Sequence, residues 1–228
     1  MVVLKRDGVE LAGLWFTVAF IGLITLGLTG FGLYVGISGM DEDAAFPLIV
    51  TGGFMAIMTL YVAQDALARS RTRIAIDDKN VMLRLPSRRG HVRFAPVNQT
   101  IARADIAAIE HRTETFNAMA KQETYALALR DGSRLILGSD KQMIPPFFGD
   151  AARALANQGA IPVRGIGVVE AKTGFMLMWG ASVPPWQTAP MPEAKAARVL
   201  AHTENFLAYS RWIILAGLAL SVAARAWG

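Results

Sequence analysis

Two long apolar runs at the start of the chain, separated by a short acidic turn, constrain the fold more than any other feature. The runs cover residues 11–38 and 46–66, and the turn covers residues 41–43. Each run is long enough to cross the hydrocarbon core of a bilayer, which takes about 20 residues of helix. The sequence therefore predicts a transmembrane helical hairpin over residues 1–68.

The charges that flank the hairpin predict its orientation. Five cations lie on the side opposite the acidic turn: Lys5, Arg6, Arg69, Arg71 and Arg73. By the positive-inside rule, both ends of the hairpin are cytoplasmic and the turn lies outside. Juxtamembrane cations also attract anionic lipid, at about 1 kcal/mol each. Arg69, Arg71 and Arg73 are therefore candidates for contact with lipid phosphate, and the alternative is that they serve topology and solubility alone.

Glycines are frequent in the first apolar run and include one GxxxG pair, Gly32 and Gly36. Small residues let helices approach closely in lipid, where no hydrophobic effect drives helix pairing. Two interpretations follow. The pair packs against the second run, which offers Gly52 and Gly53, or it contacts a partner subunit.

Composition separates this chain from ordinary soluble domains. Of its 228 residues 53% are hydrophobic, with a mean hydropathy of +0.35, yet the middle of the chain is polar. This combination is typical of a membrane protein with one extramembrane domain. The net charge of +5 is attributed to cytoplasmic flanks, and no nucleic-acid partner is expected. The absence of cysteine excludes disulfides, thiolate nucleophiles and zinc ribbons.

The apolar pattern changes from helical to alternating near residue 72, which predicts β-structure. Asp131-Gly132 is a hairpin signal. The expected strands cover residues 74–76, 81–85, 92–94, 106–112, 125–129 and 135–137. A short amphipathic helix is expected over residues 147–157, with Gly159 as its C′ residue.

The segments TRIAIDDKNVMLRLP, TIARADIAAIEHR and YALALRDGSRLILGS, followed by a terminal helix, resemble the pleckstrin-homology-like (PH-like) domains of bacterial membrane-anchored proteins. The resemblance covers about residues 71–159. It implies an antiparallel β-barrel or sandwich capped by one helix, in a cytoplasmic domain over residues 69–160. It also implies a non-enzymatic module for protein association at the membrane. The first turn, residues 77–80, carries two acids rather than a basic motif, so lipid-headgroup recognition is not implied.

Residues 161–191 form an extension that does not fit this domain. The segment is rich in glycine and contains Trp179 and Trp186. Either it adds one or two strands and packs on the domain, or it lies at the bilayer surface with these tryptophans at headgroup depth.

The last segment, residues 192–228, begins with a proline that favours a helix start. An amphipathic helix is expected to continue into a third transmembrane span over about residues 206–227, with Trp212 as a further surface anchor and the C-terminus outside. The fold class is therefore three transmembrane helices plus an α+β cytoplasmic domain.

No motif for catalysis, cofactor binding or metal binding emerges. Glu110, His111 and Glu114 are close in sequence, but they are interpreted as a solvated cluster. Neither of the first two spans contains an ionisable residue deep in the membrane, which argues against a pump, a transporter or a proton channel.

Together these features predict a protein of the bacterial inner membrane that is not an enzyme and uses no cofactor. Its partners would be the lipid bilayer and other membrane subunits, and its role that of a scaffold, accessory or assembly subunit. Two alternatives stay open. One is a component of a membrane enzyme or transporter whose site forms only with partner chains. The other is a sensor that binds a peptide or lipid beside the helix at residues 147–157.

Overall fold

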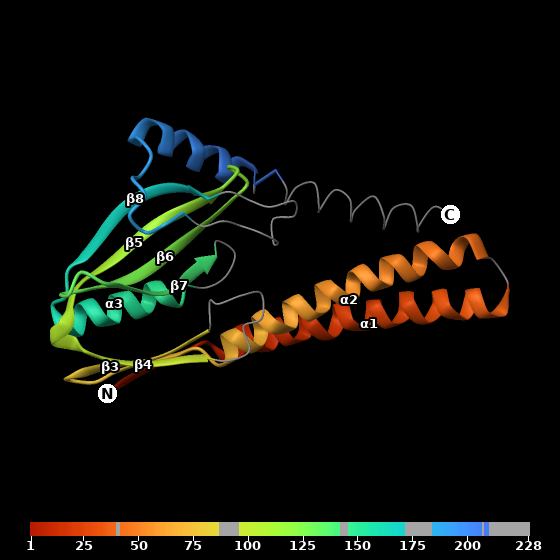
Figure 1. Cartoon of the computed structure of the whole chain (residues 1–228), viewed down its shortest axis with the longest axis horizontal. Coiled ribbons are helices and arrows are strands. Elements are labelled where there is room, and N and C mark those ends of the chain that lie inside the picture. Colours follow the sequence, from red (N-terminus) through yellow and green to blue (C-terminus); the bar gives the residue numbers. More distant parts are fainter. Residues whose placement is uncertain (40–41, 87–95, 142–145, 172–183, 207, 210–228) are drawn as a thin grey trace. The chain divides into compact units, whose positions relative to one another are not determined.

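The computed structural model describes residues 1–39, 42–86, 96–141, 146–171, 184–206 and 208–209 (Figure 1). The chain divides into two compact units, Met1–Arg103 and Ala104–Gly228. The expected domain over residues 69–160 is thus divided between them. Its first strands belong to the unit that contains the apolar helices, and its later strands belong to the second unit.

The first apolar run forms α1 (Gly8–Ser38), which has 31 residues and is therefore about 46 Å long. Asp7 is its N-cap, and the Asp7 carboxylate accepts a hydrogen bond from the Val9 N–H. The helix ends at Gly39, whose φ of +64° is a left-handed conformation that glycine adopts without strain.

The second run forms α2 (Glu42–Ser70), which returns alongside α1 (Figure 1). The two helices contain the candidate membrane spans Gly8–Ser38 and Ala45–Ser70. Their large apolar side chains are exposed, as at Phe16 (72%) and Phe46 (71%). A core helix of a soluble protein would bury such side chains, so the exposure indicates a lipid environment for the hairpin.

The first sheet has the strand order β1–β2–β3–β4, with antiparallel pairing throughout. Its strands are β1 (Val2–Lys5), β2 (Arg73–Ile76), β3 (Asn80–Pro86) and β4 (Pro96–Ala102). One face carries the buried apolar side chains of Ile74, Ile76, Val81, Leu83 and Ile101. The opposite face carries most of the polar residues, as the alternation of side chains along a strand requires.

The second sheet has the order β7–β6–β5–β8. Its strands are β5 (Ile106–Phe116), β6 (Ala120–Leu129), β7 (Arg134–Lys141) and β8 (Val163–Ala171). The expected hairpin at Asp131-Gly132 is present between β6 and β7, with Gly132 at φ +85°. β8 pairs in parallel with β5, so this part of the extension adds a strand to the domain, as the first of its two interpretations expected.

α3 (Phe148–Gly159) packs against β6 and β7. The Asp140 carboxylate caps its start by accepting hydrogen bonds from the backbone N–H groups of Phe147, Phe148 and Gly149, at 2.7–3.0 Å. The expected C′ residue was wrong by one position. Gly159 is the last helical residue, and Ala160 takes the left-handed conformation with φ +50°.

A further helix covers residues 193–206 and begins directly after Pro192. Ion pairs tie it to the second sheet: Lys195 with Glu170 at 3.3 Å, and Glu204 with Lys121 at 2.8 Å. The expected strand at residues 92–94 lies outside the described residues. So does almost all of the expected third span, residues 206–227, including Trp212.

Candidate functional site

The junction between the hairpin and the first sheet is built by two neighbouring strands. β1 leads into α1, α2 leads into β2, and β1 pairs with β2 so that Lys5 lies opposite Arg73. The membrane hairpin is thus an insertion between two hydrogen-bonded strands. β1 was not predicted, although the short apolar run at residues 2–4, next to the Asp7 cap, was a usable signal.

An ion-pair network joins the two helices at this junction. The Glu10 carboxylate accepts hydrogen bonds from Arg6 Nη1 at 2.9 Å and from Arg69 Nη1 at 3.3 Å. The Nε of Arg69 also donates to Asp65 at 2.9 Å. Arg69 is only 8% exposed, so its guanidinium is committed to the helix pair. The prediction that Arg69 contacts lipid phosphate is therefore corrected, because its guanidinium binds Glu10 and Asp65 instead.

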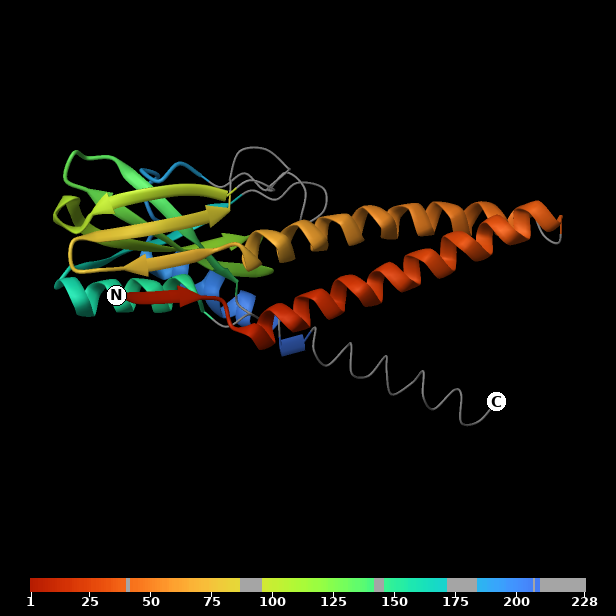
Figure 2. The same cartoon turned by 90° about the horizontal axis from the view of Figure 1, so that it is seen from below.

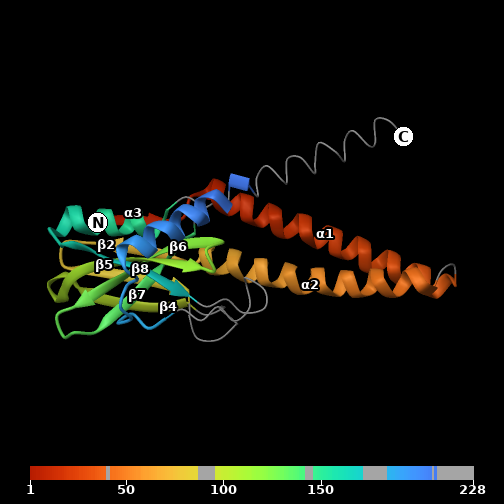
Figure 3. The same ribbon diagram turned by 90° about the horizontal axis from the view of Figure 1, so that it is seen from above.

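Small residues join the helices nearer the turn. A Cβ at Gly32 would lie 2.9 Å from Leu48 Cβ, and one at Gly36 would lie 3.4 Å from Ala45 Cβ. Gly52 faces Thr29 just as closely. Figures 2 and 3 show the helices closest near the turn and further apart toward the sheet. Glycines therefore occupy the close contact, and long Arg–Glu pairs bridge the wider end.

Gly32 and Gly36 thus pack within the hairpin, as the first of the two interpretations expected. A partner helix would have to use other positions. Gly27 and Gly30 have open space where a Cβ would stand.

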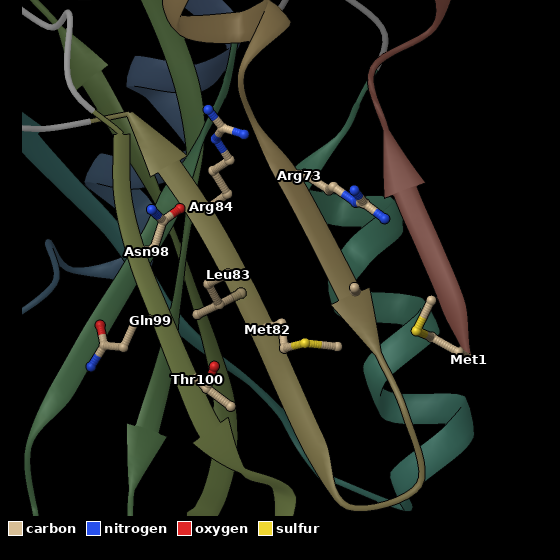
Figure 4. Close-up of a pocket in the computed structure, with 9 residues that line it drawn as sticks. Met1, Arg73, Met82, Leu83, Arg84, Asn98, Gln99 and Thr100 are labelled. Atoms are coloured by element: carbon tan, nitrogen blue, oxygen red, sulfur yellow. The ribbon is translucent and has the colours of Figure 1, made fainter.

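The polar face of the first sheet contains an open depression of about 290 Å³ (Figure 4). Residues from β2, β3 and β4, and Met1 beside β1, line it: Met1, Arg73, Ala75, Met82, Leu83, Arg84, Asn98, Gln99 and Thr100. Figure 4 shows Arg73 and Arg84 at one end of the depression and Thr100 at the other. The arginine end is the end from which the hairpin helices leave the sheet.

Three cations form a row across this face, which we call the basic face: Lys5, Arg73 and Arg84. They are successive partners in the strand register, so their side chains point to the same side, and all three are exposed. Of the arginines expected to contact lipid, Arg73 belongs to this face and Arg71 is exposed, whereas Arg69 is buried. Lys5 and Arg84 join the site only through the strand pairing.

A second polar cluster lies in the second unit and is centred on Arg112, which is 1% exposed. Its guanidinium donates to Glu114 Oε1 at 2.8 Å, and to the backbone carbonyls of Pro184 and Pro185 at 2.8 and 3.0 Å. It also lies 4.4 Å from the centre of the Trp186 ring. The arrangement fixes residues 184–186 on β5.

Glu110 completes this cluster, because it accepts hydrogen bonds from Arg134 Nε and Trp186 Nε1, both at 2.7 Å. Burial acts to raise the pKa of Glu110, but these hydrogen bonds and the charge of Arg134 outweigh it and hold the pKa below its usual value. Glu110 and Glu114 are 7% and 0% exposed. The interpretation as a solvated cluster was therefore wrong for these two acids, which are buried and paired. His111 is half exposed, with its Nδ1 3.7 Å from Glu123 Oε2.

Trp186 was a candidate membrane anchor, and the structure corrects this. The side chain is 7% exposed, and its indole N–H is bonded to Glu110. Trp186 therefore belongs to the interior of the second unit. Trp179, the other candidate anchor in this extension, lies outside the described residues.

Within the described part of the chain, no group of three or more His, Asp or Glu side chains is arranged to hold a metal ion. The charged groups around Arg112 use their hydrogen bonds on one another and on the backbone, which is the pattern of a structural network. The exposed, surplus positive charge of the basic face is instead available for binding.

Comparisons with protein-family models, with curated proteins and with solved structures find no match for this chain.

Proposed function

We propose that the protein is a membrane-anchored, non-catalytic scaffold or accessory subunit of a larger complex in the bacterial inner membrane. The observation that carries the proposal is the insertion of the hairpin between β1 and β2, which pair over four residues each. Because two residues separate each helix from its strand, the first sheet is held close to the membrane surface. A sheet attached to the membrane in this way suits a protein that positions a partner.

The lipid-facing surface of the hairpin supports the same proposal. The helices use Gly32 and Gly52 for their own packing, and Thr25 bonds to Thr59 across the pair at 3.1 Å. The two helices thus pack against each other through their own residues. The outer surface of the hairpin, where a Cβ at Gly27 or Gly30 would meet no atom within 4 Å, can contact lipid or the helices of other subunits.

We also propose that both sheets and α3 are cytoplasmic and that together they correspond to the PH-like domain of the resemblance. The order of elements supports this, because β2–β3–β4 and β5–β6–β7 are consecutive antiparallel strands and α3 follows them. β1 and the parallel strand β8 are additions to that outline. In this orientation the third span would place the C-terminus outside.

Affinity purification of the tagged protein from native membranes in mild detergent, followed by mass spectrometry, tests the proposal. We expect a defined set of membrane proteins at constant ratios to the tagged chain. Recovery of the monomer alone would overturn the scaffold role. Native membranes with the untagged protein provide the control, and a partner set made up of enzyme or transporter subunits would identify the process that the protein serves.

A further inference from the structure

We propose that the basic face, formed by Lys5, Arg73 and Arg84, binds the headgroups of anionic phospholipids in the membrane that the hairpin crosses. The inference rests on the membrane anchoring proposed above and adds a ligand class to it. It also replaces the expected set of lipid contacts, because it excludes Arg69 and brings in two cations far apart in the sequence.

The first step is the spacing of the cations. Lys5, Arg73 and Arg84 occupy one row on three adjacent strands. Neighbouring strands lie about 4.8 Å apart, so the row spans about 10 Å. This width matches one or two phospholipid headgroups, and Asn98 extends the row on β4 with a hydrogen-bonding side chain.

The second step is the position of the row relative to the membrane. Lys5 precedes the first residue of α1 by three positions, and Arg73 follows the last residue of α2 by three. The row therefore lies at the end of the sheet from which the spans leave. Cations at such a place are within about 10 Å of the headgroup layer. This distance equals the Debye length at 0.1 M salt, so their attraction to anionic headgroups is not fully screened.

The third step is the distribution of negative charge. Within the described residues, no carboxylate oxygen lies within 4.0 Å of Lys5, Arg73 or Arg84. Of the acids near the helix ends, Glu10 and Asp65 are paired with Arg6 and Arg69, and the Asp7 carboxylate caps α1. The row is thus surplus positive charge next to the membrane.

The acids of the first sheet lie at its opposite end. Asp77 and Asp78 form the turn between β2 and β3, and the Asp77 carboxylate accepts hydrogen bonds from the backbone N–H groups of Lys79 and Asn80. The sheet is therefore polarised along its strands, with the positive end toward the anionic surface.

The test uses the full-length protein in bilayers that contain spin-labelled phosphatidylglycerol or phosphatidylcholine. The association constant of each lipid relative to the unlabelled bilayer is measured at low and high salt. We expect the wild-type protein to select phosphatidylglycerol, by up to about fivefold for each cation at low salt. The triple variant Lys5→Gln, Arg73→Gln, Arg84→Gln should lose this selectivity.

The matched control is the triple variant Lys79→Gln, Arg153→Gln, Arg198→Gln, which removes the same charge from exposed positions outside the basic face. Its selectivity should equal that of the wild type. If both triple variants lose selectivity equally, or neither does, the basic face is not a lipid site. An acidic protein partner would then be the candidate occupant.

A second measurement leaves the cations in place. Because the chain has no cysteine, Asn98→Cys and Asp78→Cys each provide a single labelling site. Asn98 lies next to Arg84 of the basic face, and Asp78 lies in the turn between β2 and β3. A probe at Asn98 should be restricted when phosphatidylglycerol is added, whereas a probe at Asp78 should not respond. Equal responses would overturn the proposal. A protein that washes off the membrane in carbonate would instead overturn the anchoring itself.

Discussion

Lys5 and Arg73 lie opposite each other on adjacent antiparallel strands, and the chain between them contains both apolar helices. This pairing closes the base of the hairpin with backbone hydrogen bonds, and the Glu10–Arg69 contact closes it with charge. A tilt of either helix would therefore be transmitted to the first sheet. The sheet and the hairpin are expected to move as one body on the membrane surface.

The orientation of the hairpin can be tested with two matched single-cysteine variants. Asp43→Cys lies at the start of α2, beside the acidic turn, and Asp78→Cys lies at the turn of the first sheet, and both positions are exposed. We expect a membrane-impermeant maleimide to label Asp43→Cys in intact cells, because the positive-inside rule places this turn outside. Asp78→Cys should react only after the membrane is disrupted. The reverse pattern would invert the topology.

The helix contact near the turn predicts a large difference between two glycines of α1. Gly32→Val should destabilise the protein by about 1–3 kcal/mol, because the added side chain overlaps Leu48 and Ile49 of α2. Thermal unfolding in detergent measures the effect. Gly30→Val is the control, because a Cβ at this position meets no atom within 4 Å and the change in helix propensity is the same. Equal losses in the two variants would show that the helices do not pack in this way.

The hairpin could be predicted from the sequence because each span is a continuous apolar run with a charge asymmetry at its ends. The β-hairpin at Asp131-Gly132 could be predicted because its turn chemistry is local. The complete first sheet could not be predicted from such local signals. Its strand β1 is only four residues long, and it is paired across the entire hairpin.

The burial of the cluster around Arg112 could not be predicted from the sequence for a different reason. Glu110, Arg112 and Glu114 alternate along β5 as a solvated strand face would. The return of Pro184, Pro185 and Trp186 onto that face contributes to its burial, and Arg134 and Gln122 from neighbouring strands satisfy its acids. A charged side chain is buried when partners distant in the sequence satisfy it, and a local pattern contains no information about them.

The contact between α3 and β7 predicts a destabilising mutation whose effect a second mutation should reduce. A methyl group at Gly138 would overlap the ring of Phe148, so Gly138→Ala should destabilise the second unit by about 1–3 kcal/mol. Chemical denaturation followed by a probe on α3 measures the loss. In the background of Phe148→Leu the same change should cost much less, because the ring that it meets is gone. Additive losses in the double variant would contradict this contact.

Glu110 should make the stability of the second unit depend on pH. Its pKa in the folded protein lies below the ordinary value of 4.5, because the hydrogen bonds from Arg134 and Trp186 outweigh the effect of burial. The ionised Glu110 therefore stabilises the fold fully above about pH 4.5, and this contribution is lost as the pH falls through the lowered pKa. Glu110→Gln should cost about 1.5–3 kcal/mol at neutral pH, because it weakens two charge-assisted hydrogen bonds.

The measurement that isolates this effect is the difference in unfolding free energy between the wild type and Glu110→Gln as a function of pH. The difference should be constant near neutral pH and should shrink in acid, because protonation removes the charge that the variant lacks. Asp150→Asn provides the control, since Asp150 is exposed and pairs with Arg153 on the same helix. A difference that stays constant down to acid pH would show that Glu110 is not ionised against Arg134 and Trp186 in the folded protein.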